Sequence, residues 1–313
     1  MLEKIPQKID IKEKFEKHYK NMLGNDYDEF MEYSLSYIRK AIRVNTLKVS
    51  VEELKKRLEK NWKLTPIPWC KEGFWIEYRN EKRFDIGNLL EHHLGYIYIQ
   101  EAASMIPPVV LQPEKNETIL DMCSAPGSKA TQISALMENT GLLVCNDVKG
   151  DRLKALGINL QKAGCTNTVI TLMPGERINM EFDRILVDAP CSGMGTIRKS
   201  LKTLKMWNMN LVERLTRTQK YLIDSAFRNL KKDGVLVYST CTLEPLENEG
   251  IVSFLLEKYD NAKLEEIKLP IKRQIPISSF KEKQFHPDVK KCLRIHPNDN
   301  DTEGFFVARI RKD

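Results

Sequence analysis

The sequence predicts an α/β protein whose main domain is a doubly wound, largely parallel sheet. Three apolar runs, at 118–122, 184–188 and 235–239, each end abruptly in small or polar residues. Continuous apolar runs of this kind are typical of buried parallel strands, and open α/β sheets bind ligands at the carboxyl ends of their strands. We therefore expect three segments that lie far apart in the sequence to meet at one ligand site.

The alternation of strands and helices along residues 118–259 supports this fold class. Strands are expected at 118–122, 142–147, 168–172, 184–188 and 235–239, and helices at 127–138, 151–163, 211–231 and 246–259. Two further strands, at 292–296 and 305–311, have no helix between them. Because antiparallel strands need no crossover helix, these two predict an antiparallel edge to the sheet.

The N-terminal part has a different pattern. Residues 11–40 have helical periodicity with a break at 24–26, and a strand-like alternation follows at 41–48. Ser50, with Glu53 three residues later, has the spacing of a capping box and predicts a helix start. Short strands are expected at 64–66 and 73–78.

These elements predict two domains. We expect a small N-terminal α+β module over residues 1–95 and the main, doubly wound domain over 96–313. In the connection between them, a strand-like piece leads into a short helix, which Pro107 and Pro108 are expected to interrupt.

Composition excludes several classes of protein. Of the 313 residues, 42% are hydrophobic and 30% are charged, and no apolar run reaches the roughly 18–20 residues that a membrane helix needs. The first 20 residues lack the apolar centre of a signal peptide. We expect a cytoplasmic protein with no membrane partner. No isolated apolar helix face demands a partner, so a monomer is the default expectation.

The seven cysteines are odd in number and widely spaced, and no Cys-x-x-Cys occurs. This pattern argues against a disulfide framework and against a structural zinc site, so no metal is expected. Cys70, Cys145, Cys165 and Cys292 are interpreted as small buried hydrophobes. Cys191 and Cys241 differ from these four because each follows the end of an expected strand.

Basic residues are concentrated directly after Cys191. Ten lysines and arginines stand between residues 198 and 232, opposed by Glu213 and Asp224 alone. The net charge of +7 is by itself weak evidence for nucleic-acid binding. The concentrated segment is more specific: it predicts a phosphate-binding wall beside the site, with a solvated helix face as the alternative.

The loop after the first strand of the main domain points to a nucleoside cofactor. It lacks the Gly-x-Gly-x-x-Gly of dinucleotide sites and the Gly-Lys-Ser/Thr of a phosphate loop, and has a small-residue turn at 123–127 instead. The next strand ends in Asp147, where an acidic residue is placed to hydrogen-bond ribose hydroxyls. With no pyrophosphate site, S-adenosylmethionine is favoured over NAD.

Two cysteines at such a site fit methyl transfer to carbon 5 of a pyrimidine. Carbon 5 of cytosine becomes nucleophilic only after a thiolate adds to carbon 6, which is covalent catalysis. The reaction also needs acid–base groups at the base edge, for which Asp188, Lys129 and a second cysteine are candidates. The target base must be extruded or single-stranded.

Three motifs carry a resemblance to a known family. Asp-Met-Cys-Ser-Ala-Pro-Gly-Ser-Lys at 121–129, Asp-Ala-Pro-Cys-Ser-Gly at 188–193 and Tyr-Ser-Thr-Cys-Thr at 238–242 closely resemble the Nol/Nop/Sun family of RNA cytosine-5 methyltransferases. The resemblance covers most of the chain. It also includes the segments 43–46, 100–105, 247–249 and 304–306.

The resemblance implies a Rossmann-like S-adenosylmethionine methyltransferase domain and assigns roles to its residues. Cys241 would be the nucleophile, and Cys191 would assist proton removal and product release. Asp188 would contact both cofactor and base, with Lys129 beside it. The implied cofactor-binding residues are Cys123, Ser124, Ala125, Pro126, Gly127, Ser128, Lys129, Asp147, Arg152 and Asp188. The N-terminal module over residues 1–95 would help to bind the RNA. The individual residues expected to bind RNA are Arg43, Asn45, Arg198, Lys199 and Lys202.

The resemblance also implies which class of nucleic acid is the substrate. The short chain and small N-terminal module are similar to the tRNA branch of the family, with rRNA as the runner-up. A DNA cytosine-5 methyltransferase, which would use the Pro-Cys cysteine as nucleophile, and a non-catalytic RNA-binding assembly factor remain as alternatives. One departure concerns the adenine side, where the family's Asp after the third strand corresponds to Gly175.

Overall fold

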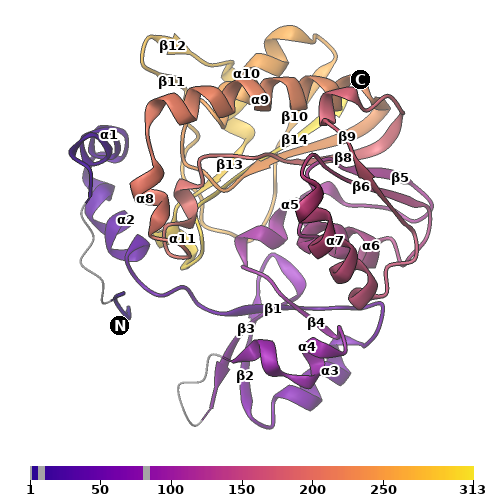
Figure 1. The fold of residues 1–313 in the computed structure, drawn as a ribbon. Coiled ribbons are helices and arrows are strands. Elements are labelled where there is room, and N and C mark those ends of the chain that lie inside the picture. The colour runs from indigo at the N-terminus through magenta and orange to yellow at the C-terminus, as the bar shows by residue number, and fades with distance from the viewer. Residues whose placement is uncertain (1, 6–10, 80–84) are drawn as a thin grey trace.

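The computed structural model describes residues 2–5, 11–79 and 85–313. Its main domain is built on a large sheet with strand order β10-β14-β9-β8-β5-β6-β7, and β13 pairs with β14. Figure 1 shows this sheet above a separate small one. The strands of the large sheet are β5 (Thr118–Asp121), β6 (Leu142–Asp147), β7 (Thr168–Leu172), β8 (Phe182–Asp188), β9 (Leu230–Thr240), β10 (Ala262–Glu265), β13 (Leu293–Ile295) and β14 (Phe305–Lys312).

The register of the three central strands brings their carboxyl ends together. β8 pairs in parallel with both β5 and β9, and places Asp188 opposite Ser239 and Leu186 opposite Asp121. Cys241 follows directly after the end of β9. The expectation that segments distant in sequence meet at one edge of a parallel sheet is thereby confirmed.

Helices cover both faces of the large sheet, as the βα alternation predicts. One face packs against α5 (Ile106–Leu111), α6 (Ser128–Leu136) and α7 (Gly150–Ala163), and the other against α9 (Met209–Arg228) and α10 (Glu249–Lys258). The predicted helices and strands of this domain are all present. Pro107 and Pro108 lie in the first turn of α5 rather than interrupting a helix, because the first N–H groups of a helix need no intrahelical partner.

The antiparallel edge is also present, and it is larger than expected. β14 pairs antiparallel with β9, and both β13 and β10 pair antiparallel with β14. β10 was not predicted. Its sequence, Ala-Lys-Leu-Glu, is too short to reveal a period. Around this edge lie a two-stranded ribbon of β11 (Ser279–Phe280) and β12 (Lys283–Gln284), and the short α11 (Pro297–Asn300).

The small sheet has the order β2-β3-β1-β4 and is antiparallel throughout. Its strands are β1 (Ala41–Val44), β2 (Trp62–Ile67), β3 (Cys70–Tyr78) and β4 (Ile97–Ile99), with α3 (Val51–Leu58) and the short α4 (Leu90–His93) beside them. The Ser50 hydroxyl accepts a hydrogen bond from the Glu53 amide at 3.1 Å, so the predicted cap is present. Because β4 completes this sheet, the small domain extends past the boundary expected at residue 95.

The first two helices pack against the large domain and not against the small sheet. Side chains of α1 (Glu13–Leu23) and α2 (Tyr27–Ser34), including Phe15 and Phe30, share a buried cluster with Ile197 and Trp207 near α8 (Lys202–Met206). Figure 1 places α1 and α2 beside α8 and α11, away from the small sheet. Helical periodicity identifies these helices correctly, but it cannot tell which domain their apolar faces cover.

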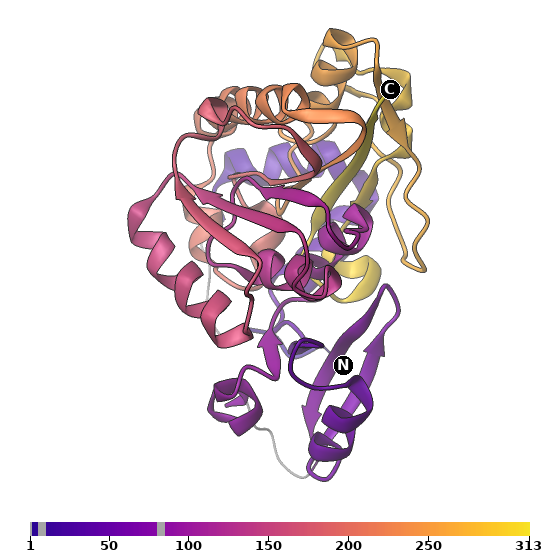
Figure 2. The same cartoon turned by 90° about the vertical axis from the view of Figure 1, so that its right-hand side faces the viewer.

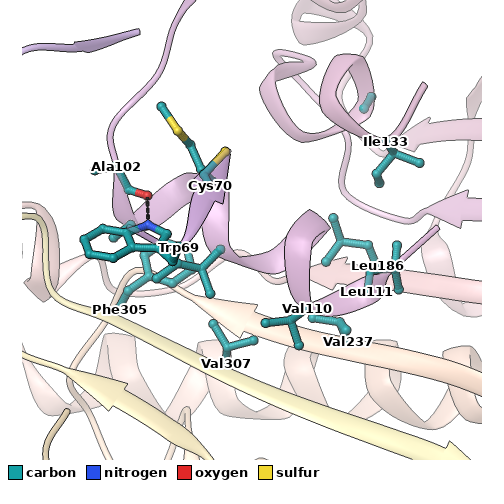
Figure 3. Packing of buried hydrophobic residues seen from close by; sticks show 14 of the residues in the cluster. Trp69, Cys70, Ala102, Val110, Leu111, Ile133, Leu186, Val237, Phe305 and Val307 are labelled. Atoms are coloured by element: carbon teal, nitrogen blue, oxygen red, sulfur yellow. Dashed lines mark hydrogen bonds between the residues drawn. The ribbon is translucent and has the colours of Figure 1, made fainter. Parts of the chain in front are cut away.

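The two domains share one hydrophobic core. Trp69 and Trp75 of the small domain are buried in the same cluster as Leu111, Phe305 and Val307 of the large one. Figure 3 shows Trp69 beside Phe305, with its indole N–H donating to the Ala102 carbonyl at 2.9 Å. In both ribbon views (Figure 1, Figure 2) the small domain sits against one side of the large one. The small domain is therefore packed firmly onto the catalytic domain.

A close backbone crossing fixes the segment after β9. The Gly195 amide donates to the Cys241 carbonyl at 2.9 Å, and the Gly304 amide donates to the Gly195 carbonyl at 3.0 Å. A Cβ atom at Gly195 would lie 2.0 Å from the Gly304 oxygen and 2.9 Å from the Cys241 oxygen. Three segments of the catalytic domain therefore meet at a position that only glycine can occupy.

We expect Gly195→Ala to destabilise the protein by about 2 kcal/mol or more, because overpacking here must displace backbone. The free energy of unfolding in urea measures this effect. Gly87→Ala is the matched control, since a Cβ atom at Gly87 would meet no atom of the described residues within 4 Å. An equal effect of the two substitutions would contradict a tight crossing at Gly195.

Candidate active site

A cleft with a volume of about 410 Å³ opens at the carboxyl ends of β5, β8 and β9. The segments that line it come from both domains and include β4 of the small sheet. Its lining residues are Tyr98, Ile99, Gln100, Glu101, Ser104, Asp121, Cys123, Ser124, Ala125, Pro126, Ser128, Lys129, Arg152, Asp188, Thr196, Lys199, Cys241, Glu303 and Phe305. The sequence-predicted catalytic residues and the predicted cofactor loop thus lie in one place.

Cys191 and Cys241 lie side by side. Their Sγ atoms are 3.2 Å apart, within hydrogen-bond reach, and both thiols are free. Cys241 belongs to the lining of the cleft and Cys191 does not, although the side chains of both are partly exposed. The hydrogen bond with Cys241, together with burial, raises the pKa of Cys191 well above its ordinary value. Cys191 therefore holds its proton and can donate it toward the Cys241 sulfur.

Asp188 is held by two donors. Lys129 Nζ donates to Asp188 Oδ2 at 2.7 Å, and Ser239 Oγ donates to Asp188 Oδ1 at 2.8 Å. Lys129 also donates to Ser104 Oγ at 3.0 Å. Burial acts to lower the pKa of Lys129, but the adjacent Asp188 charge outweighs burial and the pKa is raised. Lys129 therefore stays cationic and orients the carboxylate at the cleft.

The turn that opens α6 follows directly after β5. The Ser124 amide donates to the Asn146 carbonyl at 2.7 Å, and the Gly127 amide donates to the Ser124 carbonyl at 2.7 Å. Gly127 has a φ of 105°, in the left-handed region that favours glycine. The turn lays Cys123, Ser124, Ala125 and Ser128 along the cleft. Burial raises the pKa of Cys123, so this thiol is not a second nucleophile.

Asp147 is buried and engaged within the protein. Its carboxylate accepts from the Lys149 amide at 3.0 Å and the Ala125 amide at 3.3 Å, and it pairs with Arg152 at 3.2 Å. Arg152 also donates to the Ala125 carbonyl, and both residues line the cleft. In this arrangement Asp147 holds the turn at 123–127 and Arg152 in place.

Two residues expected to bind RNA are structural instead. Arg43 is 2% exposed, and its guanidinium donates to groups on α6 and to Gln100, including the Ser128 carbonyl at 2.7 Å and Thr131 Oγ1 at 2.9 Å. Asn45 is 3% exposed and donates to the Gly95 carbonyl at 2.8 Å and the Ala163 carbonyl at 2.7 Å. Both side chains join β1 to the catalytic domain, so the expectation of RNA contact is wrong for them.

Arg198 is a third correction. Its side chain is fully buried, pairs with Asp301 at 2.7 Å and donates to the Tyr37 carbonyl at 2.7 Å. It ties the segment after α2 to the segment before β14. Lys199 and Lys202 differ from it, since both are exposed and Lys199 lines the cleft. These two lysines stay candidates for contact with a nucleic-acid backbone.

Several cleft residues were not singled out from the sequence. Ser104 and Ser239 position Lys129 and Asp188, and both lie inside quoted motifs, so their hydroxyls could have been found there. Asp121 is fully buried at the cleft, and its two carboxylate oxygens have no hydrogen-bond partner in the described residues. Burial and the nearby Asp188 charge raise the pKa of Asp121 to about 7. Glu303 has no sequence signal beyond its place before the closing strand.

The turn after Cys241 is fixed by buried polar groups. Glu247 accepts from the Ser192 amide at 3.0 Å and from Gln219 at 2.8 Å. Asn248 accepts from the Thr240 hydroxyl at 2.6 Å and donates to the Thr242 carbonyl at 2.9 Å. These contacts join the segments that carry the two cysteines. They give a physical role to the Glu-Asn-Glu segment at 247–249.

Gly175 stands where the related family has an aspartate near the adenine of the cofactor, and close packing leaves no room there for a side chain. A Cβ atom there would lie 2.7 Å from Leu222 Cδ2 and 3.0 Å from Met122. The neighbouring Glu176 is exposed, and neither residue is in the lining of the cleft.

The described residues contain no group of three or more His, Cys, Asp or Glu side chains able to hold a metal ion. Within the same ranges, no helix is long and apolar enough to cross a membrane.

Comparison with known proteins identifies the family. The model of the 16S rRNA methyltransferase RsmB/F family matches residues 108–311, and that of the N-terminal domain of 16S rRNA methyltransferase RsmF matches residues 11–102. The chain belongs to the RsmB/F methyltransferase family. The two matched ranges meet in the connection after β4, close to the end of the small sheet.

Relatives of this RsmB/F-family chain include a tRNA (cytosine(49)-C(5))-methyltransferase from Pyrococcus abyssi, 47% identical over 97% of this chain and 99% of the relative. Ribosomal RNA small subunit methyltransferase F from Shewanella oneidensis is 43% identical over 91% of this chain. The chain spans 60% of that rRNA enzyme's length.

Solved structures agree with the fold. A methyltransferase homologue from Pyrococcus horikoshii has a TM-score of 0.85 at 35% identity, covering 95% of this chain and 94% of its own. NSun6 from Pyrococcus horikoshii with SFG, an analogue of S-adenosylmethionine, has a TM-score of 0.82 at 26% identity, covering 96% and 98%.

Proposed function

We propose that this chain is an S-adenosylmethionine-dependent tRNA cytosine-5 methyltransferase with Cys241 as its nucleophile. One observation carries the proposal: Cys241 lines the cleft together with Asp188 and Lys129, while Cys191, whose sulfur is 3.2 Å from that of Cys241, is not part of the lining. A nucleophile has to reach the base, and Cys241 is the cysteine of the pair placed to do so. We expect the enzyme to act in the cytoplasm.

In the proposed reaction the Cys241 thiolate adds to carbon 6 of the target cytosine. Carbon 5 becomes nucleophilic and is methylated. The carbon 5 proton then passes to an acid–base group at the cleft, for which Asp188 and Cys191 are the candidates, and the carbon 6–sulfur bond breaks with its electron pair returning to Cys241 as the thiolate. Cys191 assists these last steps, because its thiol is within 3.2 Å of the Cys241 sulfur and can exchange a proton with it. Asp188, oriented by Lys129 and Ser239, accepts from the exocyclic amino group of the base.

The cofactor half of the cleft fits S-adenosylmethionine. Asp121 and Ser124 present buried oxygen atoms without partners, which suits the charged amino group of an amino-acid-bearing nucleoside. The turn from Cys123 to Lys129, with Arg152 and Asp188, would hold the rest of the molecule. When bound, the cofactor supplies an electrophilic methyl group. Asp147 would act through Arg152 and Ala125, to which it is bonded.

tRNA is the substrate we favour, because the Pyrococcus abyssi relative that acts on tRNA matches this chain over almost its entire length. The rRNA relatives carry a large further part that this chain does not match. A DNA cytosine-5 methyltransferase would need Cys191 at the cleft. A non-catalytic assembly factor would have no use for a cationic lysine and an accessible thiol in one cleft.

Methyl transfer from labelled S-adenosylmethionine to unmodified total tRNA and rRNA, followed by nucleoside analysis, tests this proposal. We expect the label in tRNA as 5-methylcytidine. Label in rRNA alone would keep the chemistry and change the substrate. No label in either RNA, with the protein folded and cofactor bound, would overturn the proposal.

The exposed lysines beside the cleft are expected to contact the RNA backbone. Replacing both Lys199 and Lys202 by glutamate should weaken RNA binding and reduce the slope of log affinity against log salt by about one per lost phosphate contact. Lys263→Glu, on the edge strand β10, is the matched control. An unchanged slope in the double variant would show that these lysines are solvated surface residues that do not contact RNA phosphates.

A further inference from the structure

Glu303 lines the cleft, and the backbone next to it is bonded to the segment that carries the proposed nucleophile. It directly precedes Gly304, whose amide donates to Gly195 at 3.0 Å, and Gly195 in turn donates to the Cys241 carbonyl at 2.9 Å. Glu303 lines the cleft together with Asp188, Thr196, Lys199 and Cys241. Glu303 is therefore held next to the segment that carries Cys241, on the lining of the same cleft.

The carboxyl group of Glu303 is buried and incompletely satisfied. The residue is 4% exposed, and Oε1 has no hydrogen-bond partner within the described ranges. Buried polar atoms without partners are rare in folded proteins and often mark a ligand's place. Glu303 thus presents an unused oxygen at the cleft.

A second buried acid, Glu101, decides how Glu303 is protonated. Glu101 accepts hydrogen bonds from the amides of Ala103, Ser104 and Glu303, at 2.7, 3.2 and 3.1 Å. Burial raises the pKa of Glu101, and these three bonds act against the rise because they stabilise its charged form. The turn that carries them is anchored by Trp69, which donates to the Ala102 carbonyl (Figure 3). Of the two acids, Glu101 is the one equipped to hold the negative charge.

Glu303 is surrounded by charges of both signs. Burial, followed by the Glu101 charge, raises the pKa of Glu303 to about 8, and Lys199, Lys129 and Arg198 act in the opposite direction. Two of these cations are already paired, Lys129 with Asp188 and Arg198 with Asp301, each at 2.7 Å. Burial and the Glu101 charge therefore favour the neutral form of Glu303, in which its carboxyl group has one proton to donate.

The chemistry of cytosine requires such a donor. Its Watson–Crick edge has the exocyclic amino donor beside the N3 acceptor. Asp188 accepts from both Lys129 and Ser239, so it can take a further bond from the amino group but has no proton to give to N3. When a thiolate adds to carbon 6, electron density moves toward N3, and a proton delivered there lowers the barrier.

We propose that Glu303 is a catalytic acid that protonates N3 of the target cytosine as Cys241 adds to carbon 6, and this rests on the proposed function above. The Cys241 sulfur forms its bond to carbon 6 with its own electron pair. The π electrons of the carbon 5–carbon 6 bond shift through the ring to N3, which takes the Glu303 proton and leaves a carboxylate. When the thiolate is later eliminated, the N3 proton returns to Glu303. No other reactant is needed for this exchange.

Glu303→Gln tests the inference, because glutamine keeps the shape and an N–H donor but cannot transfer a proton. The readout is the rate of covalent adduct formation with RNA containing 5-fluorocytidine, measured from pH 6 to pH 10. For the unaltered protein we expect a rate that falls above about pH 8, as Glu303 ionises. For Glu303→Gln we expect a rate about 10² to 10⁴-fold lower at neutral pH, without that decline.

Two further measurements keep the test sharp. The affinity for S-adenosylhomocysteine should change by less than about threefold in Glu303→Gln. Such a result would show that the substitution leaves the cofactor-binding part of the cleft intact. Glu101→Gln removes a neighbouring negative charge, so the decline should move to lower pH. A decline that persists unchanged in Glu303→Gln, or a rate within about threefold of the unaltered protein, would overturn the inference. Absence of any adduct in the unaltered protein would instead count against the proposed function.

Discussion

Replacing Cys241 by alanine is expected to abolish both methyl transfer and the covalent adduct with RNA. Without a thiolate at carbon 6, carbon 5 of cytosine stays too weak a nucleophile to be methylated. Cofactor binding should persist, because the hydrogen bond of the Cys241 thiol is to Cys191 and not to the turn at 123–129 or to Arg152. Single-turnover methyl transfer and gel-resolved adducts, with cofactor affinity as the control, measure these effects.

Cys191→Ala is expected to differ in kind. The adduct should still form at Cys241, but its breakdown should slow by about 10² to 10⁴-fold, because the thiol that exchanges protons with Cys241 is gone. The adduct should therefore accumulate. Cys165→Ala, a half-buried cysteine packed against the core, is the matched control and should leave both steps unchanged. Loss of the adduct in Cys191→Ala with retention in Cys241→Ala would reverse the assignment.

Arg43→Met should destabilise the protein by about 2–4 kcal/mol, because it leaves several buried acceptors without a donor. These acceptors include Gln100 Oε1 at 2.6 Å, the Ser128 carbonyl at 2.7 Å and Thr131 Oγ1 at 2.9 Å. Burial lowers the pKa of Arg43 to about 10, and the methionine relieves that desolvation, which limits the net loss. The Ser128 carbonyl lies in the first turn of α6, so cofactor affinity should fall as well.

Urea denaturation measures the loss in Arg43→Met. Arg57→Met is the matched control: Arg57 is exposed on α3 of the same domain, and its pair with Glu53 at 2.7 Å is worth little. If Arg43→Met leaves the free energy of unfolding unchanged but weakens RNA binding, Arg43 contacts RNA and has no structural role.

The catalytic domain could be predicted closely because its strands are continuous apolar runs that end in polar motifs. The run at 184–188 and the run at 235–239 pair in parallel, and this alone brings Asp188 and Cys241 to one edge. The chemistry of the site then follows from the types of residue at the strand ends.

Which of the cationic residues are buried and which are exposed could not be predicted in the same way. Arg43, Arg198 and Lys199 are the same kind of side chain in the sequence, yet the first two are buried and the third is exposed. What separates them is the position of acceptors far away in the chain, such as Ser128 for Arg43 and Asp301 for Arg198. Local pattern contains no information about such distant partners.

The same limit applies to the N-terminal helices and to Glu303. The apolar face of α1 is evident from its period, but Trp207, which it covers, lies nearly two hundred residues later. The preference of Glu303 for its neutral form comes from burial and from the neighbouring Glu101. Neither of these can be inferred from one acidic residue that precedes a predicted strand.

The most direct test of the account is to locate the covalent bond to the target base. The unaltered protein is incubated with S-adenosylmethionine and tRNA containing 5-fluorocytidine, digested with protease and nuclease, and analysed by mass spectrometry. The account predicts the modified nucleotide on the peptide that contains Cys241, with Cys191 unmodified. A nucleotide attached to Cys191 would contradict it.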